Sequence, residues 1–139
     1  MKFLLDTNVI SEMQKLRPNA GAVQWLQLAD ETTIFISVLT WAEIRYGVEL
    51  IPEGVKRRRI TQWLEFDLAQ RFYNRILPID FRVADRWGKL LVERAAHGQT
   101  LPPMDALIAA TAQVHDLAVV THNVAHFQGA CPHVVDPWD

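Results

Sequence analysis

The sequence predicts an α/β domain with a mostly parallel central sheet of four or five strands. Short apolar runs alternate along the chain with longer segments in which apolar residues have helical spacing. Each clear run is too short to form a helix and is followed by polar or turn residues, which is typical of a buried strand. The predicted strands are residues 3–5, 34–38, 76–79 and 117–120, with a weaker fifth at Val134 and Val135.

The segments between the predicted strands carry the helices. In residues 81–97, Val83, Trp87 and Leu90 follow steps of three and four, and Gly98 is a natural end for that helix. Its apolar face is expected to cover the sheet. Three further helices are expected: a short one directly after the second strand (Trp41, Ile44, Val48), one after the turn at Pro52 and Gly54 (Ile60, Trp63, Leu64, Phe72), and one after Pro102 and Pro103. Trp41, Trp63 and Trp87 fall on the apolar helix faces and are expected in the core.

Composition limits the function classes. The chain has 139 residues, enough for one domain with a sizeable core, and no linker or repeat divides it. With 14 Lys and Arg against 16 Asp and Glu, the formal net charge is −2, so nucleic-acid binding has to rest on local basic patches. No apolar run is long enough for a membrane span or a signal peptide, which predicts a protein without membrane association.

Cysteine usage points to a reducing compartment. The single cysteine, Cys131, cannot form an internal disulfide, and the Cys and His spacings of zinc sites are absent. We therefore expect a cytoplasmic protein in which Cys131 is a packed or half-exposed side chain.

Three acidic residues lie where an α/β sheet places its chemistry. In open sheets of this class, ligands bind beyond the carboxyl ends of the parallel strands. Asp6 directly follows the first strand, Glu43 lies in the first turns of the helix after the second, and Asp105 lies in the first turn of the helix that opens at Pro102. We expect these three carboxylates to converge on one crevice.

Taken singly, each acid has a structural explanation. Asp6 suits a cap or turn before Thr7, and Asp105 suits the positive end of a helix dipole. Glu43 suits a solvated helix face, although its neighbours Trp41 and Ile44 indicate partial enclosure. Together, however, three converging carboxylates repel one another unless a cation neutralises them. Oxygen ligands without Cys or His favour Mg²⁺ or Mn²⁺ over zinc, and the implied chemistry is on phosphodiesters.

Four motifs now carry a family resemblance. They are FLLDTNVIS at the start, ISVLTWAEIRYG around Glu43, LPPMDALIAATA around Asp105, and LAVVTHNVAHF after them. In this order and spacing they resemble the PIN-domain ribonucleases, and among these the VapC and FitB-like toxins of type II toxin–antitoxin pairs. The resemblance covers essentially the whole chain.

The resemblance implies a three-layer α/β/α PIN domain over residues 1–139. It implies an Mg²⁺-dependent (or Mn²⁺-dependent) endoribonuclease that hydrolyses single-stranded RNA, with the metal bound by Asp6 and Asp105 and with Glu43 acting directly or through water. It also implies a homodimer and a cognate antitoxin protein. The supporting polar residues are Thr7, Asn8, Thr121 and Asn123.

Two positions depart from the family pattern. His122 stands where relatives usually have arginine, which puts a substrate contact from that position in doubt. His126 stands where many relatives have an acid, just before Phe127. Because histidine is a poor ligand for Mg²⁺, His126 is expected at the surface or beside the acids, and Asn123 is expected to assist the three remaining carboxylates.

The candidate RNA contacts are Arg57, Arg58, Arg82 and Arg86, although the run of residues 56–59 is more typical of a solvated helix start. Two other functions stay open. One is a catalytically weak PIN-fold subunit that mainly binds an antitoxin in a DNA-binding, autoregulatory complex. The other is a phosphatase or DNA nuclease that uses the same carboxylates.

Overall fold

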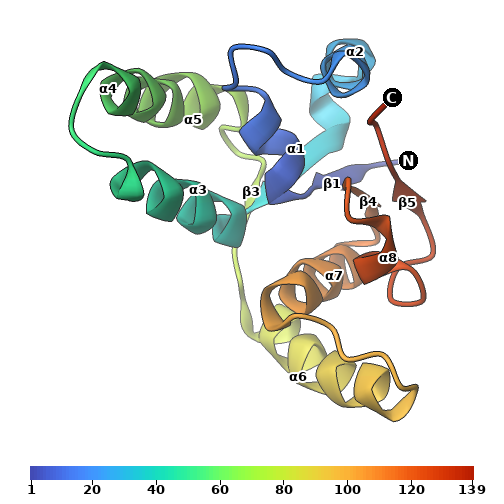
Figure 1. The fold of residues 1–139 in the computed structure, drawn as a ribbon. Coiled ribbons are helices and arrows are strands. Elements are labelled where there is room, and N and C mark those ends of the chain that lie inside the picture. Colours follow the sequence, from blue (N-terminus) through green and yellow to red (C-terminus); the bar gives the residue numbers. More distant parts are fainter.

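The centre of the molecule is a parallel five-stranded sheet with strand order β3-β2-β1-β4-β5 (Figure 1). The computed structural model describes all 139 residues. The strands are β1 (Phe3–Leu5), β2 (Ile34–Ser37), β3 (Ile76–Leu77), β4 (Ala118–Val120) and β5 (Val134–Val135). All five predicted strands are present, and the prediction of a mostly parallel sheet is confirmed.

Helices cover both faces of this sheet. Figure 1 shows α6 and α7 below it and α1, α2, α4 and α5 above it, which confirms the predicted three-layer α/β/α fold. None of the helices combines the length and apolar character that a membrane crossing needs. The helices are α1 (Thr7–Glu12), α2 (Ala20–Leu28), α3 (Val38–Leu50), α4 (Val55–Gln62), α5 (Ala69–Arg71), α6 (Phe81–Ala96), α7 (Pro103–His115) and α8 (Val124–Phe127), with a 3-10 turn η1 (Glu31–Thr33) and a π-helical segment η2 (Trp63–Leu68).

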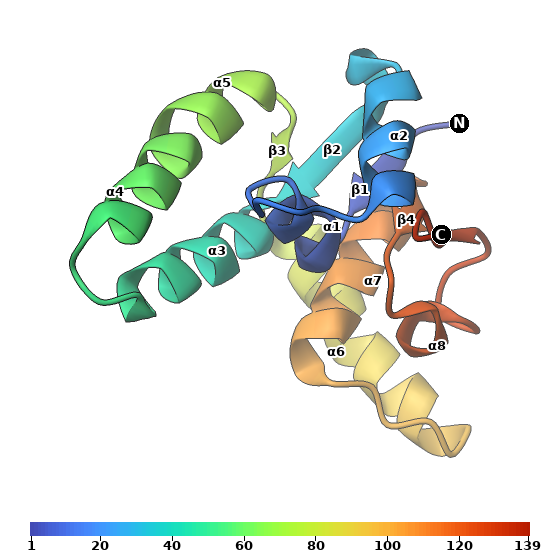
Figure 2. The same ribbon diagram turned by 45° about the horizontal axis from the view of Figure 1, so that its top comes forward.

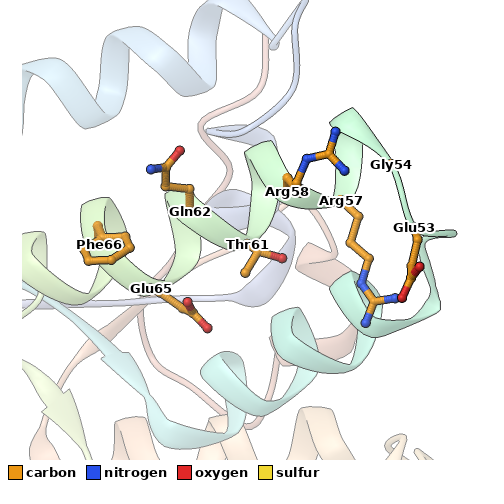
Figure 3. A pocket seen from close by; sticks show the side chains of 8 residues that line it. All are labelled: Glu53, Gly54, Arg57, Arg58, Thr61, Gln62, Glu65 and Phe66. Carbon is orange, nitrogen blue, oxygen red and sulfur yellow. The ribbon is translucent and has the colours of Figure 1, made fainter.

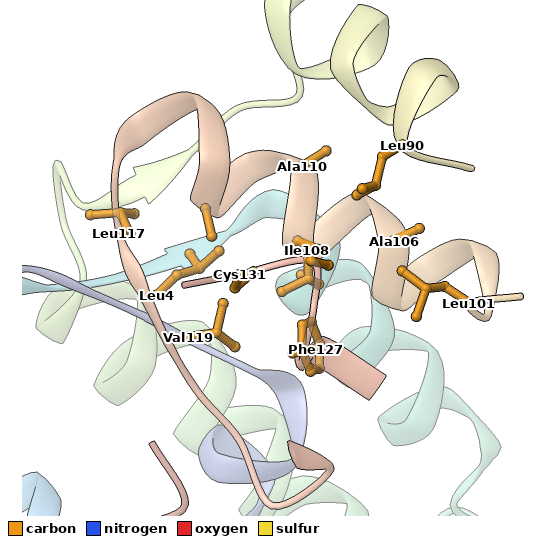
Figure 4. Close-up of a cluster of buried hydrophobic side chains, with 13 residues drawn as sticks. Leu4, Leu90, Leu101, Ala106, Ile108, Ala110, Leu117, Val119, Phe127 and Cys131 are labelled. Carbon is orange, nitrogen blue, oxygen red and sulfur yellow. The ribbon is translucent and has the colours of Figure 1, made fainter. Parts of the chain in front are cut away.

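Two apolar clusters form the core, one on each face of the sheet. Successive residues of a strand point to opposite faces. Leu4 therefore lies in the cluster between the sheet and helices α6 and α7, while Leu5 lies in the cluster between the sheet and helices α1 to α4. The first cluster is drawn in Figure 4 and includes Cys131, whose burial raises the pKa of its thiol to about 11. Cys131 is therefore a packing residue, as predicted.

The predicted element ends shift by one or two residues for local reasons. The second strand ends at Ser37 instead of residue 38, because the Ser37 side chain accepts a hydrogen bond from the backbone N–H of Leu39 at 3.0 Å and caps α3. The third strand stops before Pro78, which has no N–H to donate to a sheet. Gly98, at φ 73°, follows the end of α6 as predicted.

Three features differ from the sequence pattern. The helix expected across Ile60 and Phe72 is built from α4, η2 and α5, because a π-helical segment interrupts it. Helices α1 and α2 were not predicted. Residues 6–8, at the start of α1, suit a turn equally well. The three tryptophans expected in the core (Trp41, Trp63, Trp87) are partly buried and pack against the two clusters.

Candidate active site

Asp6 lies at the carboxyl end of β1 and caps α1. Its Oδ1 accepts the backbone N–H of Thr7 at 2.8 Å, and its Oδ2 accepts the hydroxyl of Thr121 at 2.8 Å. The residue is 5% exposed. Burial raises the pKa of Asp6 to about 6; the two hydrogen bonds oppose this shift, and the negative charges of Asp105 and Glu43 add to it. A carboxylate held in this way gains stability when a cation binds beside it.

Glu43 reaches the same place from α3. Helix α3 starts directly after β2 and lies beside α1 (Figure 2). The hydroxyl of Thr7 donates to Glu43 Oε1 at 2.7 Å, so Thr7 connects Glu43 to Asp6 through its side chain and its backbone. Glu43 is exposed, which corrects the partial enclosure expected from its apolar neighbours: those neighbours on the helix turn toward the sheet instead. A solvent-facing carboxylate is free to reach a ligand directly or through water.

Asp105 approaches from the other layer, in the first turn of α7. Its side chain is 22% exposed, and its Oδ2 lies 2.5 Å from Nδ1 of His126, which is on α8. His126 is therefore a direct hydrogen-bond partner of Asp105, and it lies beside the acids at the surface, as expected. With one carboxylate oxygen held by His126, the other oxygen of Asp105 is the one available to a ligand.

The loop after β4 is joined to α1 by the predicted polar residues. Thr121 is fully buried; besides donating to Asp6, its hydroxyl accepts the backbone N–H of Asn123 at 2.9 Å. The side-chain oxygen of Asn8 accepts the backbone N–H of His122 at 3.2 Å, and its Nδ2 lies 3.5 Å from Asp6 Oδ2. These bonds hold the carboxyl ends of β1 and β4 together under the acids.

The three acids open into one cavity of about 540 Å³. Asp6, Glu43 and Asp105 therefore share a crevice, together with the predicted supporting residues Thr7 and Asn8. The complete lining is Asp6, Thr7, Asn8, Ser11, Glu12, Lys15, Glu43, Asp105, His122, Asn123 and Trp138.

Sequence reasoning missed four lining residues: Ser11, Glu12, Lys15 and Trp138. It noted His122 only as a departure from the family pattern. A signal existed for two of the four, because Asn8, Ser11 and Glu12 recur at steps of three and four and share one face of α1. Nothing local indicates Trp138, which reaches the cavity only through the tertiary fold.

Glu12 is a fourth acid in the cavity, but its charge is already balanced. It is 6% exposed and accepts hydrogen bonds from the backbone N–H of Asn19 at 2.7 Å and from Lys15 Nζ at 2.8 Å. Burial by itself would raise the pKa of Glu12, and the bonds from Lys15 and Asn19 outweigh it, so the net pKa is lowered. Glu12 therefore stays ionised and paired, whereas the acids of the active cluster have no basic partner other than His126.

The donor set fits a hard divalent cation. The carboxylates of Asp6, Glu43 and Asp105 and the side-chain oxygen of Asn123 supply only oxygen. No three acidic, His or Cys side chains form a ready-made ligand shell here. Mg²⁺ typically takes one or two protein carboxylates and keeps water or phosphate oxygens in its other positions, so an open cavity with separated carboxylates suits it.

The four predicted arginine contacts lie outside this cavity. Arg57 and Arg58 line a second cavity of about 410 Å³ beside α4 (Figure 3). Arg57 also pairs with Glu49 of α3. Arg86 is held by Glu93 at 2.8 Å and also bonds Gln113. Arg82 lies 3.9 Å from Asp80. Lys15 is the basic residue of the acidic cavity.

Comparisons with known proteins agree with this architecture. The chain matches the PIN domain family over residues 3–128. It is 38% identical to Toxin FitB of Neisseria gonorrhoeae, over 97% of each chain, and 31% identical to VapC ribonuclease Y4jK of Sinorhizobium fredii, over 98% of this chain and 97% of that one.

Solved structures show the same fold. The crystal structure of FitAcB from Neisseria gonorrhoeae superposes with a TM-score of 0.93 at 38% identity, covering 98% of each chain. A structure of FitAB bound to an IR36 DNA fragment has a TM-score of 0.93 at 36% identity, covering 99% of this chain and 96% of that one. With its parallel sheet, its crevice of three acids and these matches over nearly its full length, the chain belongs to the PIN-domain family.

Proposed function

We propose that this protein is an Mg²⁺-dependent or Mn²⁺-dependent endoribonuclease that hydrolyses single-stranded RNA as the toxin of a toxin–antitoxin pair. The observation that carries the proposal is Asp6: a buried carboxylate with a pKa raised to about 6, sharing one open cavity with Asp105 and Glu43. A buried acid with a raised pKa that lies in a cavity is typical of an active site. Relatives named toxin and ribonuclease support the same function.

The three acids have separate tasks in this proposal. Asp6 and Asp105 hold the cation, and Glu43 assists directly or through a bound water. When bound, the cation polarises the scissile phosphate and lowers the pKa of the attacking water. Thr121 and the backbone N–H of Thr7 fix the Asp6 carboxylate, and His126 fixes that of Asp105, so both present their free lone pairs to the cavity.

Single-stranded RNA suits the cavity because unpaired bases and a flexible backbone enter an open crevice more easily than a duplex does. Lys15 is the nearest cation for a phosphate in the cavity. Arg57, Arg58, Arg82 and Arg86 remain proposed contacts for flanking nucleotides; of these, Arg57 and Arg86 would first release their present partners.

The proposed partner is a cognate antitoxin protein that covers the acidic cavity, with a homodimer of this chain as the unit it binds. The proposal places this complex in the cytoplasm, where RNA substrates occur. A second candidate keeps these partners but removes the enzyme: a catalytically weak subunit of a DNA-binding complex. The structure of FitAB bound to a DNA fragment is the observation that favours it.

One assay separates these functions. Purified protein without antitoxin is incubated with end-labelled single-stranded RNA, duplex RNA and single-stranded DNA, each with Mg²⁺, Mn²⁺ or EDTA. We expect cleavage of single-stranded RNA with either cation and none in EDTA. Preferential cleavage of DNA would reject the RNA assignment, and absence of cleavage of every substrate would favour the non-catalytic candidate.

His126 gives a prediction specific to this chain. Replacing His126 with Ala removes the hydrogen bond that orients Asp105, and the affinity for Mn²⁺ is expected to fall about tenfold, the lower end of the effect of losing such an orienting partner. His126→Asp, which restores a carboxylate, is expected to bind Mn²⁺ at least as tightly as the wild type. Titration calorimetry measures both. His133→Ala, at an exposed histidine outside the cavity, is the control; equal affinities in His126→Ala and the control contradict the prediction.

A further inference from the structure

Two aromatic rings form one wall of the acidic cavity. The rings of His122 and Trp138 stack with their centroids 4.5 Å apart and an angle of 19° between their planes. Both residues line the cavity that contains Asp6, Glu43 and Asp105. They come from opposite ends of the last part of the chain: His122 follows β4, and Trp138 follows β5. The pair is thus a stack of two aromatic rings next to the acids.

The stack is held in place from several sides. Asp136 Oδ1 accepts the backbone N–H of Trp138 at 3.0 Å and lies 3.3 Å from Nδ1 of His122, so one carboxylate aligns both rings. The backbone N–H of His122 is fixed by Asn8. On its other side, Trp138 packs against the apolar cluster beneath α1 to α4.

The segment that carries Trp138 is also seated closely against α2. A Cβ atom at Gly21 would lie 2.6 Å from the carbonyl oxygen of Pro137 and 2.8 Å from the backbone nitrogen of Asp139. Only glycine therefore permits this approach at position 21. Figure 1 shows the C-terminus beside α2. The aromatic wall is a fixed part of the cavity and its position depends on Gly21.

His122 presents an open ring face. Its side chain is 51% exposed although Trp138 covers one face of the ring. Trp138 is partly buried and supports the covered face of the His122 ring. Nucleobases stack on the rings of His and Trp in proteins that bind single-stranded RNA, and such stacking tolerates any base because each has a π-face. Lys15, in the same cavity, would have to release Glu12 before it could pair with an adjacent phosphate.

We propose that the His122–Trp138 pair is a nucleobase-binding subsite, on which one unpaired base of the RNA substrate stacks against His122 while the neighbouring phosphate reaches the acids. This inference rests on the proposed ribonuclease function and adds a substrate contact to it. The subsite favours unpaired RNA because a paired base cannot leave its own stack without losing its partner.

The test combines a protein change with an RNA change. A short fluorescein-labelled adenosine oligomer, and a set in which each position in turn is abasic, are titrated with protein in EDTA so that no hydrolysis occurs. At one position, loss of the base is expected to weaken binding to the wild type about tenfold, the scale of one base–aromatic stack. The same abasic oligomer is expected to bind His122→Ala no more weakly than the intact oligomer does.

Three further variants define the effect. His122→Phe keeps a ring and is expected to retain the position-specific loss, His133→Ala is the matched control with wild-type behaviour, and Gly21→Ala is expected to reduce the loss by displacing Trp138. A change in His122→Ala that is equal for intact and abasic oligomers, or no affinity of the wild type for any oligomer, overturns the subsite. A loss of affinity at one abasic position that disappears in His122→Ala, together with no hydrolysis in Mg²⁺, supports the subsite and rejects the ribonuclease function.

Discussion

Asp6→Asn is expected to stabilise the protein in the absence of divalent cations. The wild-type carboxyl has a pKa of about 6 in the folded chain against its ordinary value of 3.8, so its ionisation costs the folded state about 3 kcal/mol when complete. Asn is nearly the same size, carries no charge and is as good a helix cap. The variant is therefore expected to exceed the wild type by up to about 3 kcal/mol in its free energy of unfolding at pH 7.5.

The pH dependence follows from the sign of this shift. A folded-state pKa above the unfolded value means that the folded protein holds the Asp6 proton more tightly. The contribution of Asp6 to stability is therefore fully present below pH 3.8 and is lost as the pH rises through about 6. The gap between Asp6→Asn and the wild type is thus expected to be small near pH 4 and complete above pH 7. Urea unfolding in EDTA across this range measures it.

Two controls isolate the cause of the stability gap. Asp85→Asn removes an exposed acid on α6 and is expected to show no comparable gap at any pH. Adding Mn²⁺ at about 100 times its dissociation constant should raise the wild type by about 3 kcal/mol and leave Asp6→Asn unchanged. A gap that does not vary with pH would show that the buried charge of Asp6 is not its origin.

Asp105→Asn is expected to lower the rate of RNA hydrolysis on the order of 10³-fold, because a cation at the reacting phosphate contributes several kcal/mol of transition-state stabilisation. Asn keeps an oxygen that can accept a hydrogen bond from His126, so the geometry is retained while the charge is lost. The residue lies in a partly exposed first turn, and the fold is expected to tolerate the change. Single-turnover cleavage of single-stranded RNA at saturating Mg²⁺ measures the effect.

A matched control for Asp105 exists on the same helix. Asp116 ends α7 in the left-handed conformation (φ 55°), which Asn adopts readily, and it is exposed. Asp116→Asn is expected to cleave RNA at the wild-type rate. Equal rates for Asp105→Asn and Asp116→Asn would remove Asp105 from the proposed active site.

The fold was largely predictable because burial on both faces leaves a clear pattern. Each strand of the parallel sheet is a short apolar run, and even the two-residue strand Val134–Val135 was visible. Short-range chemistry fixed the exact ends, as at Ser37 and Pro78. Helix α1 was not predictable, since its first residues, Asp6 and Thr7, suit a turn equally well, and only the fold shows that Asp6 is a cap with a second role.

The site was predictable in its acids and not in its surroundings. Rules for parallel sheets place Asp6, Glu43 and Asp105 at one edge. The contact between His126 and Asp105 and the wall formed by Trp138 depend on contacts between distant segments, and no local pattern encodes them.

Calorimetric titration of the metal-free protein with Mn²⁺ at pH 7.5 tests the central claim most directly, because the proposed activity depends on a divalent cation held by Asp6 and Asp105. Saturable binding is predicted for the wild type and for Asp116→Asn, and loss of this binding for Asp6→Asn and Asp105→Asn. Absence of binding to the wild type, or the same affinity in Asp6→Asn, would contradict the assignment of this cavity as a metal-dependent active site.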